Sequence, residues 1–285
     1  MTTEMNNVLV MSVPLASIDR NEFGLLIQDH LSNKGKLRVA KINTEYLMRS
    51  LRNKDFADLL RHNDLNIVDG RGVLWASKYL SLPVSRKGFV RVIQSIFQLV
   101  YSGAAIVFNP AYIKQPITDS FPGIDAMRLM LEAAIAKGVS VYIFGAQEAV
   151  LERAVRNLRT AYPGLLIAGY HHGYGDGNAV VEDINESGAK MLFVALGSPK
   201  QEYWIQDNVD KLTDIKVVVA EGGTLDRLAS PRKVAPRWLN HIGLEWLWRL
   251  FVNRDLTGEK SRFKRVWNAV PVFIYRTLIW KISHE

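Results

Sequence analysis

The chain has 285 residues, no cysteine and a formal net charge of +8 at pH 7. Without cysteine it can form no disulfide, no thiolate nucleophile and no Cys-based zinc or iron–sulfur site. The first seven residues, Met-Thr-Thr-Glu-Met-Asn-Asn, lack the basic flank and long apolar core of a signal peptide, so we expect a cytoplasmic protein.

The positive charge is concentrated at one end of the chain. Residues 227–285 hold twelve Lys or Arg and four acids, whereas residues 1–226 are neutral overall. Five of the seven tryptophans also lie after residue 226. Basic residues interleaved with tryptophan suit an anionic membrane surface, and nucleic acid is the alternative partner. We therefore divide the chain into a neutral body, 1–226, and a basic, Trp-rich tail, 227–285.

The first part of the body predicts alternating strands and helices. Apolar runs at 7–13 and 37–42 predict two strands, and a helix is expected over 20–32 between them. The second strand runs into Asn43 and Thr44, either of which can cap the helix that follows. The next short apolar run, 65–68, ends at Asp69-Gly70, a pair that on its own indicates a turn.

Residues 88–108 form an apolar stretch that is nearly long enough to cross a bilayer. Arg91, Gln94 and Gln98 recur within it at helical spacing and define a polar stripe. We therefore expect an amphipathic helix up to about Tyr101, lying on the membrane or packed on the body. For 104–108 the alternative is a core strand.

Two glycine turns follow. Residues 121–125 lead into an amphipathic helix that Asp125 is placed to cap. The strand at 139–144 runs into Gly145 and a helix, the parts of a nucleotide-binding crossover. The Gly-x-Gly-x-x-Gly spacing is absent, which disfavours a dinucleotide-dependent oxidoreductase.

The last three strands predicted in the body also end in polar or glycine-rich turns. The strand at 165–170 precedes His171-His172-Gly173, where side chains one residue apart point to opposite faces and so disfavour a metal pair. The strand at 191–196 ends at Gly197, where Ser198 can cap and Pro199 can begin a helix carrying Lys200, Gln201 and Glu202. The last, 215–220, ends at Glu221-Gly222-Gly223.

These seven strand-turn-helix units predict an α/β fold with a doubly wound, mostly parallel, Rossmann-like sheet. Ligands of such sheets bind at the carboxyl ends of the strands, so we expect one site along that edge.

Several motifs resemble the WecG/TagA/CpsF family of bacterial glycosyltransferases. They are Gly-Ser-Pro-Lys-Gln-Glu at 197–202, Asp-Gly-x-Gly at 69–72, Gly-x-Asp at 123–125, His-His-Gly at 171–173, Gly-Gly-Thr at 222–224 and Leu-Glu-Trp at 244–246 with Arg249-Leu250. The resemblance covers nearly the whole chain and is interrupted by an extra segment around 84–118. It implies inverting transfer of a sugar from a UDP-sugar to a polyprenyl-diphosphate-linked sugar in cell-surface polysaccharide synthesis, at the cytoplasmic face of the bacterial inner membrane.

The resemblance also implies roles for individual residues. Asp69 is expected to be the catalytic base, since an attacking sugar hydroxyl must give up its proton. Thr44 and Gln201 are expected to orient acceptor or phosphate groups, and Arg249 to steady the leaving diphosphate. No metal or other cofactor is expected, because cations and backbone amides can stabilise that charge. The other substrate-binding residues implied are Asp125, Gly145, Gly173, Gly197, Lys200, Glu202, Gly222, Gly223, Arg237 and Arg254.

The resemblance favours an anionic membrane over nucleic acid as the partner of the tail. Pro271 is expected to break or kink a helix, while Arg276 and Lys281 disfavour a bilayer span, so we expect the tail to lie in the interface as a basic helical appendage. Donor sugar, acceptor sugar and oligomeric state stay open, and a homo-oligomer is compatible with the sequence. The functional alternatives are a nucleotide-dependent oxidoreductase and a non-enzymatic membrane- or nucleic-acid-binding module.

Overall fold

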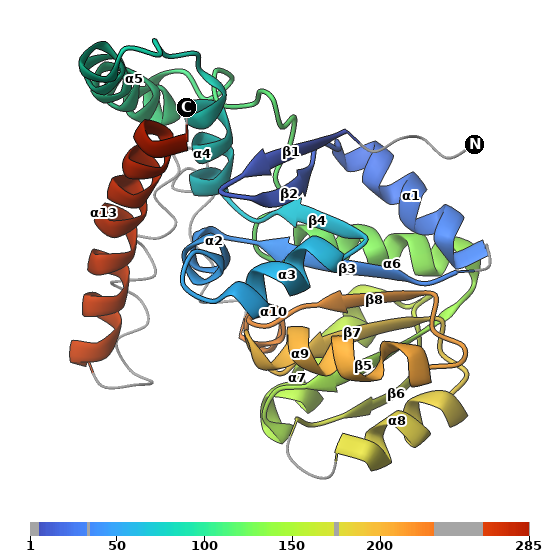
Figure 1. Ribbon diagram of the computed structural model, residues 1–285. Helices are drawn as coiled ribbons and strands as arrows, with labels where there is room; N and C mark the ends of the chain where they lie inside the picture. Colours follow the sequence, from blue (N-terminus) through green and yellow to red (C-terminus); the bar gives the residue numbers. More distant parts are fainter. Residues whose placement is uncertain (1–5, 33–34, 174–176, 231–258, 285) are drawn as a thin grey trace.

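The computed structural model describes residues 6–32, 35–173, 177–230 and 259–284, and its centre is one parallel sheet (Figure 1). Six strands pair in the order β4-β3-β8-β7-β5-β6, all parallel. The predicted α/β class with a parallel, doubly wound sheet is therefore confirmed. The strands are β3 (Leu37–Ile42), β4 (Leu65–Val68), β5 (Ser140–Gly145), β6 (Leu166–His171), β7 (Met191–Ala195) and β8 (Val217–Ala220).

Helices cover both faces of this sheet, and the central strands β7 and β8 are buried along their whole length, as their continuous apolar runs predict. One face carries α1 (Arg20–Ser32), α6 (Asp125–Lys137), α7 (Glu148–Ala161) and α10 (Thr224–Ala229). The other carries α2 (Thr44–Ser50), α3 (Lys54–His62), α4 (Arg71–Ser81), α8 (Gly177–Glu186) and α9 (Lys200–Asn208), which a 3₁₀ turn (Val209–Lys211) follows.

The first predicted strand is instead a hairpin outside the main sheet. Its antiparallel strands are β1 (Asn7–Val10) and β2 (Val13–Ala16). Met11 and Ser12 turn the chain with φ of 49° and 66°, a backbone conformation that neither residue type signals. The prediction of a single strand over 7–13 is therefore wrong, and the main sheet has six strands rather than seven.

The apolar stretch after α4 is one continuous helix, α5 (Gly88–Phe108). The strand alternative for 104–108 is therefore wrong, because the helical hydrogen bonds continue to Asn109, whose amide donates to the Ala105 carbonyl. The helix packs along α4, where Trp75 Nε1 donates to Ser102 Oγ at 3.0 Å. Within the described residues, α5 is the one helix long and apolar enough to cross a membrane, with a mean hydropathy of 1.4.

The described end of the tail is a second long helix, α13 (Glu259–His284), which packs against α5. It continues through Pro271, so a break there is ruled out, and the alternative of a kink stays a prediction. Lys281 anchors it to the body: the fully buried ammonium donates to the Tyr79 and Leu82 carbonyls at 2.5 and 2.6 Å. Because these carbonyls lie at the C-terminal end of α4, Lys281 caps that helix from the other end of the chain.

Candidate functional site

The polar turns predicted from the sequence lie along one edge of the sheet, where its parallel strands all end. Thr44 follows β3, Asp69 follows β4, Gln201 and Glu202 lie in the helix after β7, and Gly222 follows β8. The neighbouring strands β3 and β8 send their following helices, α2 and α10, to opposite faces. Such a switch point opens a crevice at the carboxyl edge, the usual ligand position in this class of sheet.

Thr44 and the turn that carries Asp69 are in contact at this edge. The Asp69 amide donates to the Ile42 carbonyl at 2.9 Å, and a Cβ at Gly72 would lie 2.8 Å from the Thr44 methyl carbon. Asn43 caps α2 by accepting from two backbone amides, so the cap position is Asn43 and not Thr44. In the described part of the chain, neither the Thr44 hydroxyl nor the half-buried Asp69 carboxylate has a hydrogen-bond or ion-pair partner, which leaves both available to a ligand.

Gln201 is held by three neighbouring elements. Its Oε1 accepts from the Gly197 amide at 3.1 Å, and its Nε2 donates to Glu202 Oε1 at 2.7 Å and to the Tyr46 hydroxyl at 3.0 Å. Gly222 closes the remaining side, since a Cβ there would lie 3.1 Å from Gln201 Oε1. The loops after β7 and β8 and helix α2 after β3 therefore meet at one buried amide.

Glu202 completes this cluster and is only 3 % exposed. Its Oε1 accepts from the Tyr46 hydroxyl at 2.6 Å, while its buried Oε2 has no hydrogen-bond partner in the described part of the chain. Burial, followed by the charge of Glu202, raises the pKa of Tyr46 well above its usual value. The Tyr46 hydroxyl thus stays protonated and donating. A buried carboxylate oxygen without a partner is an acceptor ready for a hydrogen-bond donor from a ligand.

Replacing Tyr46 by Phe is expected to lower the free energy of unfolding by about 1.5–3 kcal/mol, because Glu202 loses a buried donor to a charged group. It is also expected to lower kcat, since Gln201 loses an orienting partner. The matched control is Tyr203→Phe, which alters a half-buried tyrosine on α9 that packs on Phe56. Urea unfolding and steady-state kinetics compare the two variants, and equal behaviour would contradict a positioning role for Tyr46.

An ion pair that sequence reasoning missed spans the switch point. Lys41 Nζ lies 3.0 Å from Glu221 Oε2 and donates to the Gly123 carbonyl at 2.7 Å, and the Thr224 hydroxyl donates to the same carboxylate oxygen. The Lys41 and Glu221 side chains are 7 % and 0 % exposed. The sequence did hold a signal for this pair. Lys41 lies inside one apolar strand, and Glu221 directly follows a second apolar strand.

Asp125 lies beside the edge in a different role from the expected one. The N-cap of α6 is Ile124, which makes no side-chain cap bond, so the expectation that Asp125 caps this helix is wrong. Asp125 is the first residue of the helix, and its carboxylate forms an ion pair with Arg20 of α1 at an N–O distance of 2.6 Å. The Gly123 carbonyl that binds Lys41 connects this turn to the edge, and a role at the donor sugar stays a prediction.

Glycines pack the turns after β5, β6 and β7 tightly together. Gly145 has φ +120°, and a Cβ there would lie 2.4 Å from the Ala195 carbonyl carbon. The Gly173 amide donates to the Ala146 carbonyl at 3.1 Å, and the Ala146 amide donates to the Ala195 carbonyl at 2.9 Å. These glycines let the backbones of the three turns pack directly against one another. The predicted contact of Gly145 and Gly173 with a ligand stays a prediction.

The start of α9 differs in detail from the sequence prediction. Lys200 is its exposed first residue, and Pro199 rather than Ser198 occupies the N-cap. The Ser198 hydroxyl is buried and acts on the Tyr46 hydroxyl, whose pKa it lowers against the larger raising effect of burial. Gly223 is the N-cap of α10. The predicted Arg237, Arg249 and Arg254 lie outside the described residues, and so does the loop around them.

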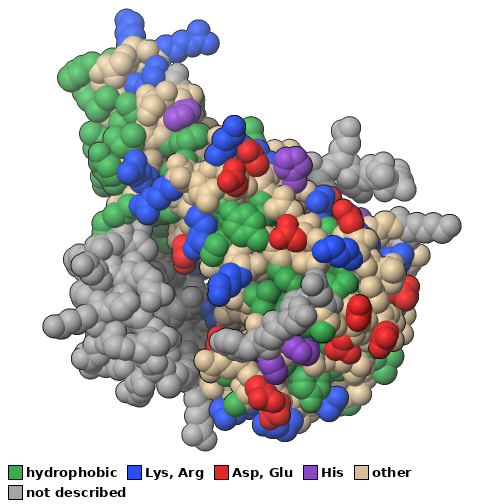
Figure 2. Space-filling model, turned by 60° about the horizontal axis from the view of Figure 1, so that its bottom comes forward, with side chains coloured by type: hydrophobic (Ala, Val, Ile, Leu, Met, Phe, Trp, Pro, Cys, Tyr) green, Lys and Arg blue, Asp and Glu red, His purple; other side chains and the backbone are tan. Residues whose placement is uncertain are grey.

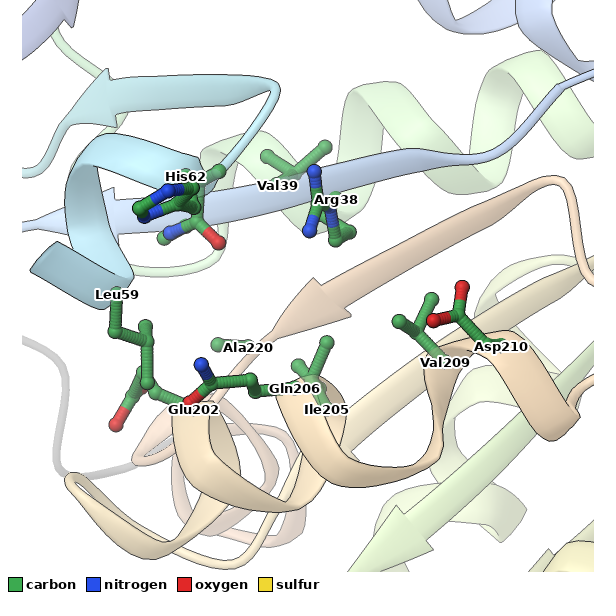
Figure 3. A pocket seen from close by; sticks show the side chains of 12 residues that line it. Arg38, Val39, Leu59, His62, Glu202, Ile205, Gln206, Val209, Asp210 and Ala220 are labelled. Atoms are coloured by element: carbon green, nitrogen blue, oxygen red, sulfur yellow. The ribbon is translucent and has the colours of Figure 1, made fainter.

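A pocket of about 270 Å³ opens between α3 and α9 and reaches Glu202 of the buried cluster (Figure 3). Leu59 and His62 of α3 and Gln206 of α9 line its sides, Arg38 of β3 lies along its floor, and Glu202 lies at its end toward the carboxyl edge. This volume is below that of ordinary small-molecule sites, so the pocket is too small for a whole nucleotide sugar. No group of three metal-ligating side chains is found among the described residues.

The sheet, its switch point and the polar groups along its carboxyl edge define a doubly wound α/β enzyme. The chain belongs to the glycosyl transferase WecG/TagA/CpsF family, whose model matches residues 8–88 and 84–285. The resemblance drawn from the motifs is thus confirmed, and the protein is a glycosyltransferase.

Two similar proteins come from Staphylococcus aureus strains MRSA252 and NCTC 8325. Each is 28 % identical over 250 residues, which cover 86 % of this chain and 93 % of the relative. Both relatives are named N-acetylglucosaminyldiphosphoundecaprenol N-acetyl-beta-D-mannosaminyltransferase.

Proposed function

We propose that this protein transfers a sugar, with inversion, from a UDP-sugar to a sugar carried on polyprenyl diphosphate. Family membership supports glycosyl transfer over the oxidoreductase and the non-enzymatic module. The relatives' names supply the first substrates to test, UDP-N-acetylmannosamine and N-acetylglucosaminyl diphosphate on a polyprenyl chain. Their names specify a β-linked product, and an α-linked UDP-sugar would be inverted in forming it.

The observation that carries the proposal is that two unlike clusters lie along the same edge of the sheet. Asp69 and Thr44 leave a carboxylate and a hydroxyl unpartnered within the described residues, suited to an attacking sugar hydroxyl. Within the described residues, the buried cluster of Tyr46, Gln201 and Glu202 leaves Glu202 Oε2 as an unpartnered acceptor suited to a hydroxyl of a bound sugar. One site therefore has groups for both substrates.

The reaction is a single displacement at the anomeric carbon. Asp69 takes the proton of the acceptor hydroxyl while that oxygen bonds to the anomeric carbon. The bond from the anomeric carbon to the phosphate oxygen breaks, and its electron pair leaves with UDP. Because attack and departure occur on opposite faces of the sugar, the configuration inverts. Thr44 and Gln201 hold the reacting groups in line, which lowers the entropic part of the barrier.

The departing diphosphate gains negative charge that must be stabilised. In the proposal no metal or other cofactor takes part. Backbone amides in the turn at Gly222–Gly223, with Lys200 at the start of α9, supply positive potential, while the turns at Gly145, Gly173 and Gly197 bring the backbone close to the UDP. Arg249 adds a guanidinium at the diphosphate, with Arg237 and Arg254 as further binding residues. Turnover is therefore expected to persist when a chelator is added.

The basic tail gives the enzyme a way to meet an acceptor that never leaves the membrane. We propose that residues 227–285 form a membrane-binding appendage to a body of residues 1–226, and that the enzyme works as a peripheral protein at the cytoplasmic face of the inner membrane. Its cations favour anionic lipid at about 1 kcal/mol for each residue near the surface. Nucleic acid is not among the proposed partners.

A panel of UDP-sugars tests the donor class. Purified protein is mixed with each, with and without anionic lipid and with and without chelator, and thermal unfolding and release of UDP are followed. The proposal predicts stabilisation by UDP and selective turnover of one sugar, with UDP-N-acetylmannosamine first among them. No response to any uridine nucleotide in the presence of lipid would overturn it.

A further inference from the structure

The polar stripe of helix α5, which consists of Arg91, Gln94 and Gln98, forms hydrogen bonds with other parts of the chain. The guanidinium of Arg91 donates to the Ile282 carbonyl of α13 at 3.0 Å. Gln94 accepts from the Ser85 amide at 2.7 Å, and Gln98 donates to the Pro83 carbonyl at 2.9 Å. The polar residues that would normally meet water on a surface helix are therefore used to bind the helix to the body.

The opposite face of α5 is apolar and exposed. Its largest side chains recur at helical spacing: Phe89, Phe97, Val100 and Phe108 are 79, 71, 66 and 86 % exposed, and Ile93 and Tyr101 lie between them. Figure 2 shows hydrophobic side chains gathered on this projecting part of the molecule, with Lys and Arg side chains at its tip. An apolar strip along a 21-residue helix is unusual on a protein surface and marks an interaction site.

The surroundings of this face carry positive charge almost exclusively. Residues 70–118, which contain α4 and α5, have six Lys or Arg and no acid. Residues 270–284 of α13, which packs against α5, contain no acid, and Arg276 is exposed there. Arg86 and Lys87 are exposed at the start of α5. An apolar strip bordered by cations matches an anionic lipid leaflet, with acyl chains below and phosphates above.

We propose that α5 lies in the membrane interface with this apolar face inserted into the lipid. The helix does not cross the bilayer, because its other face is attached to the body along its length: Ser95 and Ser102 bind Tyr79 and Trp75 of α4, which are themselves buried in the core. The helix therefore supplies the hydrophobic part of binding, and the cations around it supply the electrostatic part.

This placement brings the membrane surface to the candidate site. Arg71, two residues after Asp69, donates to the Ile106 carbonyl near the end of α5 at 3.3 Å. The C-terminal end of α5 is thus bound to the first residue of the helix that follows the turn carrying the proposed base. The inference rests on the proposed function in one respect, that the acceptor is linked to a lipid. Binding to lipid is measured separately from sugar transfer.

Phe89→Glu/Phe97→Glu tests the inserted face in the full chain. Sedimentation with vesicles of phosphatidylglycerol and phosphatidylethanolamine is expected to show binding at least about tenfold weaker than wild type, because two phenyl groups no longer leave water. The matched control is Leu25→Glu, which changes a 58 % exposed apolar side chain on α1 and is expected to bind as wild type does. Thermal unfolding confirms that each variant is folded.

A second variant, Phe97→Trp, reports how deeply position 97 enters the lipid. Its tryptophan fluorescence is compared with that of wild type, and lipids with brominated acyl chains are expected to quench the fluorescence that the added tryptophan contributes. Wild-type partitioning of the double variant, or no quenching at position 97, would overturn the inference. So would a change from dimer to monomer with unchanged vesicle binding, which would make the face an interface between copies.

Transfer to a short-chain, water-soluble acceptor separates this inference from the proposed function. The double variant is expected to keep wild-type turnover on that acceptor and to lose it on acceptor embedded in vesicles. If wild type itself is inactive on both acceptors, the proposed function fails while the vesicle measurements still decide the role of α5.

Discussion

Replacing Asp69 by Asn is expected to lower kcat for sugar transfer by about 10²–10⁴-fold while leaving UDP-sugar binding nearly unchanged. Asparagine has the same shape as aspartate but cannot take the proton of the acceptor hydroxyl. The fold is expected to tolerate the change, because the Asp69 carboxylate has no partner among the described residues. Stopped assays give kcat, and calorimetric titration with the UDP-sugar gives binding.

The matched control lies at the other end of the same strand. Asp64 precedes β4 and pairs with Arg38, with N–O distances of 2.9 and 3.0 Å. Asp64→Asn removes a carboxylate of the same kind from the opposite edge of the sheet, at a cost of about 0–1 kcal/mol for an exposed pair. It is expected to keep wild-type turnover. Near-normal turnover of Asp69→Asn would rule out Asp69 as the base.

The largest effect on stability is expected at Lys41. Lys41→Met leaves the fully buried Glu221 carboxylate without its cation and is expected to lower the free energy of unfolding by about 3–5 kcal/mol. The pair joins β3 to β8 at the switch point, so the loss is expected to loosen the turns on both sides. Urea unfolding followed by circular dichroism measures it.

A double variant distinguishes a broken ion pair from a packing defect. Lys41→Met/Glu221→Met removes both charges, and buried pairs replaced by apolar groups of similar volume are often no less stable. It is therefore expected to recover most of the lost stability. A double variant that is as unstable as the sum of the two single variants would show that the charges are not coupled.

The sheet and the positions of its turns were predictable because their signals are local. Short apolar runs, each ending at glycine or a polar residue, mark buried parallel strands within a window of a few residues. Met11 and Ser12 were missed because they turn the chain without glycine, asparagine or aspartate. The prediction of a seventh strand followed from that local ambiguity.

The contacts that build the site were not predictable, since they join distant parts of the chain. Tyr46 meets Gln201 across 155 positions, and Lys41 meets Glu221 across 180. Motifs placed Gln201 and Glu202 at the edge but gave no indication that a tyrosine from α2 holds them. For Lys41, the charge within an apolar strand was a local signal whose partner only the fold supplies.

Helix α5 illustrates a different limit. The spacing of Arg91, Gln94 and Gln98 correctly indicates a helix with two unlike faces. It does not indicate which face meets the body, because an amphipathic pattern is the same in either orientation. The packing of α5 against α4 and α13 settles this, with the apolar face outward.

The central claim is that the carboxyl edge performs inverting transfer from a UDP-sugar to a lipid-linked acceptor. The most direct measurement incubates the protein with UDP-N-acetylmannosamine and a short-chain N-acetylglucosaminyl diphosphate lipid, identifies the product by mass spectrometry, and determines its anomeric configuration by NMR. Our account predicts a disaccharide with a β linkage from an α-linked donor. A product with retained configuration, or no product with any UDP-sugar, would contradict it.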